Sequence, residues 1–125
     1  MKFAASASLL VLFAIATAAP LKVDALLAKA KDHDKKTVTV TGTVQKFEAK
    51  TSRKGNKYTT FELKGDKQVI NVYMRDHLKN PVKNGDKVSV TGIFRVEKKV
   101  GDRTFKNEVD ATAAAGTKNG VSKVK

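Results

Sequence analysis

The pattern Val-x-Val-Thr-Gly occurs twice in this chain, at Val38–Gly42 and at Val88–Gly92. In both copies the valines alternate with hydroxyl side chains, which is typical of a strand with one buried face. Each glycine falls on the apolar face, where the missing side chain lets a strand coil sharply. The rest of the two halves does not match. We therefore expect two corners of one small barrel rather than a tandem repeat.

Three further segments alternate with period two, so the pattern predicts five strands in all. Two of these segments form a hairpin because a tight polar turn joins them, and the last strand follows a turn at Gly101-Asp102. A small closed barrel is the economical arrangement for five twisted, glycine-kinked strands. The five expected strands are Thr37–Val44, Tyr58–Leu63, Val69–Met74, Lys87–Phe94 and Arg103–Ala111.

The segments around these strands carry weaker signals. Val23–Ala30 has apolar residues at helical spacing, and Asp24 can cap this short amphipathic helix. We expect a polar connection over residues 31–36. One helical turn around His77 and Leu78 is expected in the break between the third and fourth strands, and residues 114–125 are expected to be a flexible basic tail.

The N-terminus has the order of a secretory signal. A lysine at position 2 precedes an uncharged apolar run over residues 3–15, and small residues occupy positions 16 and 18. The run is shorter than the roughly 20 residues that span a bilayer. We therefore expect residues 1–18 to be a signal peptide, with release into the periplasm or the medium and no membrane segment after cleavage. A buried N-terminal helix is the alternative reading.

Net charge and cysteine content indicate which partners the protein favours and what stabilises its fold. The formal net charge is +13, which favours polyanionic partners such as nucleic acid, acidic polysaccharide or an anionic surface. The alternative is that the lysines only keep a small exported protein soluble. The chain has no cysteine, so its stability must come from an ordinary core.

The order of these segments resembles bacterial OB-fold domains of the tRNA-anticodon and helicase-associated nucleic-acid-binding type, most closely their small exported members. The resemblance rests on patterns of strands and turns, including Tyr-x-x-Phe-x-Leu, Val-Ile-Asn-Val-Tyr and Asn-Gly-Asp-Lys-Val-x-Val. It implies an all-β, five-stranded OB-fold barrel over residues 37–113, preceded by a short helix and linker over residues 19–36. It also implies a ligand face on the second and third strands, between the loops that join strands one to two and four to five.

Basic residues gather in those two loops. Tyr58 and Tyr73 are out of phase with the expected core, so their rings should point away from the barrel interior, where they can stack on bases. Either tyrosine can instead pack beneath a loop, and Phe47 can be a third platform or part of the core. The predicted site for single-stranded nucleic acid or another polyanion comprises Lys46, Lys50, Arg53, Lys54, Lys57, Tyr58, Tyr73, Lys98, Lys99, Arg103 and Lys106.

No catalytic or cofactor motif accompanies this set. With two histidines and no cysteine we expect no structural zinc site, and the aspartates are scattered in turns where Asp is common for backbone reasons. We therefore expect a non-enzymatic binding module without a cofactor. The competing hypothesis is an envelope interaction domain that recruits a protein or a glycan with the same barrel face.

Overall fold

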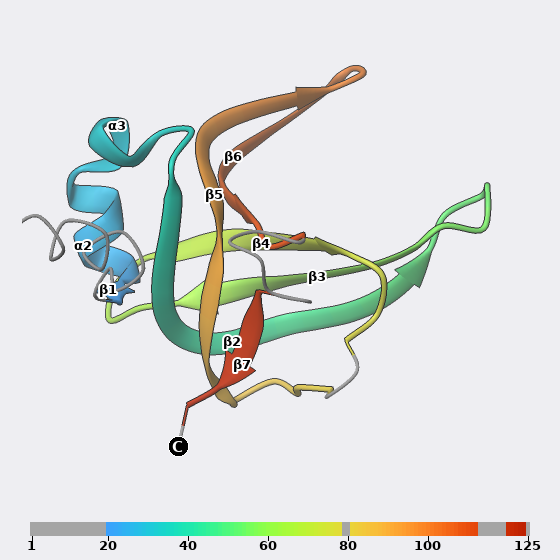
Figure 1. Cartoon of the computed structure of the whole chain (residues 1–125), viewed down its shortest axis with the longest axis horizontal. Coiled ribbons are helices and arrows are strands. Elements are labelled where there is room, and N and C mark those ends of the chain that lie inside the picture. Colours follow the sequence, from blue (N-terminus) through green and yellow to red (C-terminus); the bar gives the residue numbers. More distant parts are fainter. Residues whose placement is uncertain (1–19, 79–80, 113–119, 125) are drawn as a thin grey trace, which may run out of the picture.

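In the residues that the structure describes, the chain forms one seven-stranded sheet, preceded for the most part by two short helices (Figure 1). This computed structural model describes residues 20–78, 81–112 and 120–124. The helices are α2 (Val23–Ala28) and α3 (Ala30–His33). The strands are β1 (Leu21–Lys22), β2 (Thr37–Thr51), β3 (Lys57–Lys64), β4 (Val69–Arg75), β5 (Lys87–Val100), β6 (Arg103–Asp110) and β7 (Val121–Lys123).

Five of these strands form a ring. Their order is β2-β3-β4-β6-β5, and β5 returns to pair with β2. The contact between β4 and β6 is parallel, whereas the other four contacts in the ring are antiparallel. The outlying strands β1 and β7 add to β2 and β5. The expectation of a mostly β chain with five principal strands is confirmed at this level.

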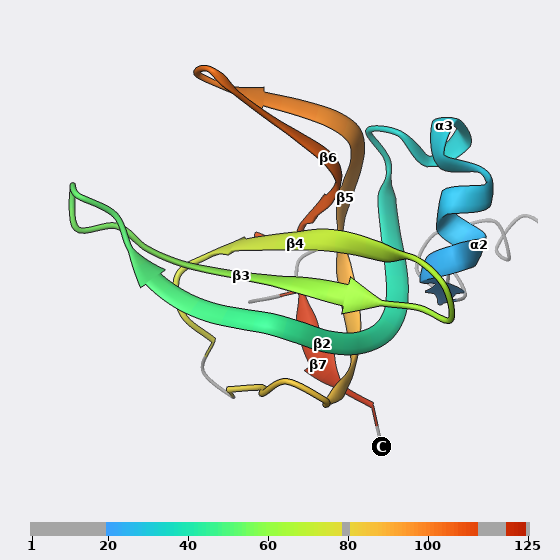
Figure 2. The same cartoon turned by 180° about the vertical axis from the view of Figure 1, so that it is seen from behind.

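The two repeated glycines lie where a strand changes partner. β2 pairs with β5 up to Thr43 and with β3 from Thr43 onward. β5 pairs with β2 up to Ile93 and with β6 from Ile93 onward. A Cβ atom on Gly42 would lie 2.8 Å from the Leu63 side chain, and one on Gly92 would collide with the backbone of β6. The glycines therefore mark two corners of the ring, and Figure 2 shows the sharp bend of β2.

The core lies inside the ring, where alternate residues of every ring strand point. Val23 and Leu26 of α2 are also fully buried, so this helix covers part of the core. Its first turn is tied to the β3–β4 turn, because the Asp24 carboxylate accepts hydrogen bonds from the backbone N–H groups of Lys67 and Gln68. The buried hydrophobic residues of the ring strands are Val38, Val40, Val44, Phe61, Leu63, Ile70, Val72, Met74, Val88, Val90, Phe94 and Val109.

The structure corrects the expected helix in two ways. The segment Val23–Ala30 is broken at Lys29, whose φ of −128° and ψ of 43° are not helical, and a second helix then runs into the expected polar connection. Asp24 does not cap α2, because the cap position is Lys22 and the carboxylate is engaged by the β3–β4 turn.

Three expectations outside the helix are also corrected. β2 and β5 continue well beyond residues 44 and 94. The expected loops are therefore mostly paired strands, which extend the β2–β3 and β5–β6 hairpins and are here called the hairpin arms. Their polar side chains hide the strand signal, although the backbone pairing is regular. His77 and Leu78 form no helical turn. Within the expected tail, Val121–Lys123 forms β7 and is hydrogen-bonded to β5.

Some expectations fall on residues that lie outside the described part of the chain. These are the signal peptide at residues 1–18 and most of the tail. Within the described ranges, no helix has the length and apolar character needed to cross a bilayer.

Candidate functional site

The two tyrosines of the predicted site lie together on one face of β3 and β4. Tyr58 is paired with Arg75, and Tyr73 is paired with Thr60, so the two tyrosines are diagonal neighbours across the hairpin. Their ring centroids are 6.0 Å apart, with 31° between the ring planes. Both side chains are half-buried. The two side chains therefore lie on the same face of the hairpin. Their rings form one small aromatic platform, the tyrosine platform, which stays partly exposed to solvent.

A lysine from each hairpin arm approaches the platform. The Lys50 ammonium lies 6.0 Å from the centre of the Tyr58 ring, and the Lys98 ammonium lies 4.7 Å from the centre of the Tyr73 ring. Cations at such distances are attracted to the electron-rich ring face. Lys50 comes from β2 and Lys98 from β5. The platform therefore has contacts with both the β2–β3 and the β5–β6 hairpin, which project to the same side of the molecule (Figure 1).

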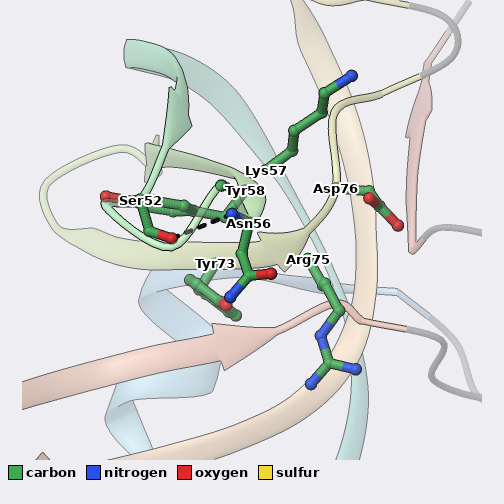
Figure 3. Close-up of a pocket in the computed structure, with 8 residues that line it drawn as sticks. Ser52, Asn56, Lys57, Tyr58, Tyr73, Arg75 and Asp76 are labelled. Carbon is green, nitrogen blue, oxygen red and sulfur yellow. Dashed lines mark hydrogen bonds between the residues drawn. The ribbon is translucent and has the colours of Figure 1, made fainter.

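A groove of about 790 Å³ opens beside the platform, where β3 begins and β4 ends (Figure 3). Its lining combines the two rings with two cations, one acid and small polar side chains. The residues are Ser52, Gly55, Asn56, Lys57, Tyr58, Tyr73, Arg75 and Asp76. A groove of this composition can take a planar group against the rings and an anionic group beside the cations.

The β2–β3 turn holds its shape through its own hydrogen bonds. The Asn56 N–H donates to the Ser52 Oγ at 3.1 Å, and the Ser52 N–H donates to the Asn56 carbonyl at 2.8 Å. Arg53 and Lys54 lie at the tip of this turn and are exposed. The turn therefore exposes two cations between Ser52 and Gly55, both of which line the groove.

Arg75, Asp76, Ser52 and Asn56 line the groove but were absent from the sequence-based site. Arg75 has a recognisable signal, because it continues the period-two phase of Tyr73 by one more step. The alternation predicts a third strand that ends at Met74, one residue before Arg75. The other three depend on how the β2–β3 turn and the end of β4 meet in space, where the Asp76 N–H donates to the Lys57 carbonyl at 2.8 Å.

Three of the predicted cations are engaged by acids. Lys46 lies 3.5 Å from the Glu62 carboxylate, and Lys50 lies 3.4 Å from that of Glu48. Lys98 donates to Glu108 at 2.8 Å, where the Glu108 side chain is only 7% exposed. Because a buried carboxylate needs its cation, Lys98 supports the platform more than it offers charge to a ligand.

The other predicted cations are exposed, and in the described residues no acid lies within ion-pairing distance of them. They lie on the two hairpin arms, at or near the β2–β3 and β5–β6 turns. These six cations are Arg53, Lys54, Lys57, Lys99, Arg103 and Lys106. The two arms that carry them flank the tyrosine platform, because Lys50 of one arm and Lys98 of the other approach its rings.

Phe47 belongs with the core and is no third platform residue. The β2–β3 register shifts between Gln45 and Glu48, and Lys46 has a φ of 51°. Such a bulge inserts an extra residue and turns the following side chain to the other face. The Phe47 ring then stacks on Phe61, with ring centroids 6.2 Å apart.

No protein-family model matches the chain, and no curated protein matches it. Within the parts of the chain that the structure describes, no three histidine, aspartate or glutamate side chains gather as a metal site would require.

Proposed function

We propose that this chain is a non-catalytic OB-fold module that binds single-stranded nucleic acid, or another polyanion, across the face that carries Tyr58 and Tyr73. The observation that carries the proposal is the pair of half-buried rings 6.0 Å apart, flanked by two arms that present exposed cations. Bases stack on aromatic rings whatever their sequence, and cations along the edges follow the phosphates.

The strand order supports the OB part of the proposal. In chain order the first ring strand pairs with the second and the fourth, and the third pairs with the fifth in parallel. A five-stranded Greek-key barrel that binds oligonucleotides uses its second and third strands together with the loops between strands one and two and strands four and five. Here those elements are β3, β4 and the two basic hairpin arms.

The proposal includes export. The composition of residues 1–18 supports a signal peptide, and a mature protein outside the cytoplasm would meet extracellular nucleic acid or acidic polymers of the envelope.

Titration with a fluorescently labelled single-stranded oligonucleotide at two salt concentrations tests the proposal. We expect binding at low salt that weakens steeply as salt rises, because bound cations release counterions from the strand. The Lys54→Glu/Lys99→Glu variant should bind about tenfold more weakly or worse, with a shallower salt dependence. Tyr58→Ala should lose about 1–3 kcal/mol of binding energy, whereas Tyr58→Phe should bind like the parent protein because it keeps the ring.

The matched control is Lys29→Glu/Lys31→Glu, which makes the same change in net charge at exposed positions near α3. Equal weakening by the control would mean that bulk charge alone attracts the strand, and that result would contradict a site on the platform. Absence of binding at low salt would also overturn the proposal. If the tyrosine variants no longer bind an envelope protein or glycan while the lysine variants still bind it, the result would favour an interaction domain instead.

A further inference from the structure

A second basic pocket lies at the other end of the β3–β4 hairpin from the tyrosines. It has a volume of about 310 Å³ and is lined by lysines from three strands: Lys22 of β1, Lys64 of β3 and Lys87 of β5. Lys64 is six residues from Tyr58 along β3, which corresponds to about 20 Å. The pocket is therefore separate from the tyrosine platform. One of its lining residues, Lys22, belongs to β1, which Figure 1 shows beside α2.

The strand register explains why these lysines meet. Thr43 of β2 is paired with Lys64 on one side and with Lys87 on the other. Thr41, two residues earlier, is paired with Lys22. Side chains of directly paired residues on neighbouring strands point to the same face of a sheet, and so do residues two apart on one strand. The partner change of β2 at this corner therefore places three lysine side chains on the face that carries the two threonine side chains.

Lys22, Lys64 and Lys87 form no ion pair within the described residues. In the described residues none of them lies within 4.0 Å of a carboxylate. Asp24 is close to Lys22 in the sequence and Asp86 is next to Lys87, but both acids already have other partners. Asp24 accepts two backbone N–H groups, and Asp86 is paired with Lys123. Asp66 is the one acid in the pocket lining. The three lysines lie on strands that flank β2, so their like charges repel one another through space, and a bound anion would relieve this repulsion.

We propose that this pocket binds a phosphate or sulfate group. Three cations and two hydroxyl donors match a compact, doubly charged oxyanion, which accepts several hydrogen bonds at once. The pocket wall also includes Val88 and Val124, so it can contact the carbon skeleton next to the anionic group. Among the described residues, no aromatic ring lines the pocket, which distinguishes it from the tyrosine platform. The proposal does not rest on the proposed function, because the two sites share no residue.

Phosphate titration of the full chain, followed by amide chemical shifts and by thermal unfolding, tests the site. At constant ionic strength we expect saturable shifts at Thr41, Thr43 and the paired lysines, and a higher melting temperature in phosphate than in chloride. Lys64→Gln/Lys87→Gln should weaken phosphate binding at least tenfold. The control Lys29→Gln/Lys31→Gln removes the same charge from exposed positions elsewhere and should leave phosphate affinity unchanged.

Glucose 6-phosphate and inorganic sulfate are parallel probes that identify the source of the group. Tighter binding of the sugar ester than of inorganic phosphate would assign the pocket to an organic phosphate, and equal binding would assign it to the free oxyanion; both results support an anion site. Shifts spread evenly over exposed lysines, or equal weakening by both double variants, would overturn the proposal. Oligonucleotide binding by Lys64→Gln/Lys87→Gln reports separately on the tyrosine platform.

Discussion

Lys98 and Lys99 are neighbours in β5, yet their side chains have different surroundings. Lys99 is exposed, whereas Lys98 donates to Glu108 at 2.8 Å and lies over the Tyr73 ring. The sequence therefore shows that a residue is basic, but not whether its charge stabilises the fold or is available to a ligand. Burial of the acceptor decides the role here, because a carboxylate removed from water requires a compensating partner.

This difference predicts opposite phenotypes for the two positions. Lys98→Met should lower the free energy of unfolding by about 2 kcal/mol, because it leaves the buried Glu108 without its charged donor. Lys99→Met, the matched control, should leave stability unchanged and weaken oligonucleotide binding. Urea unfolding of both variants measures the first effect. A stable Lys98→Met protein with weakened binding would show that Lys98 contacts the ligand directly.

At the scale of elements, the corners of the ring depend on glycine. Gly42 and Gly92 each precede the residue at which their strand leaves one partner for the next. A partner change requires two backbones to approach closely on the inner side of the bend, where a Cβ has no room. The repeated Val-x-Val-Thr-Gly pattern therefore encodes two bends as well as two strands.

Gly92→Ala should be destabilising because its Cβ would meet the carbonyl group of Asp110, which is backbone and cannot rotate away. We expect a loss of about 1–3 kcal/mol, as for other overpacked positions, in urea unfolding followed by circular dichroism. Ser89→Ala in the same strand changes an outward side chain and should have little effect. If the two variants prove equally stable, the corner tolerates a side chain and the close-approach argument is wrong.

At the scale of the whole molecule, positive charge exceeds what the fold can pair. The chain has 25 lysines and arginines against 12 aspartates and glutamates, and the described ranges hold four ion pairs. Most cations are thus solvated and repel one another, which favours polyanion binding and opposes compaction.

Salt should therefore act in opposite directions on stability and on binding. Between low salt and about 0.1 M sodium chloride, where the screening length falls to about 10 Å, the melting temperature should rise because repulsion is screened. Oligonucleotide affinity should fall over the same range. Calorimetry and the fluorescence titration measure the two trends in the same buffers. A melting temperature that falls with salt would mean that attractive ion pairs outweigh the repulsion.

Three features can be predicted from the sequence because each depends on residues within one strand: the alternation of the five strands, the two glycine corners, and the outward phase of Tyr58 and Tyr73. Three others depend on how the chain folds: the strand order, the length of the hairpin arms, and the inward turn of Phe47 at the Lys46 bulge. The fold also determines which cations have acids as neighbours, and that Lys22, Lys64 and Lys87 meet around one pocket. These outcomes depend on pairing between distant segments, and a local pattern carries no information about which strand lies next to it.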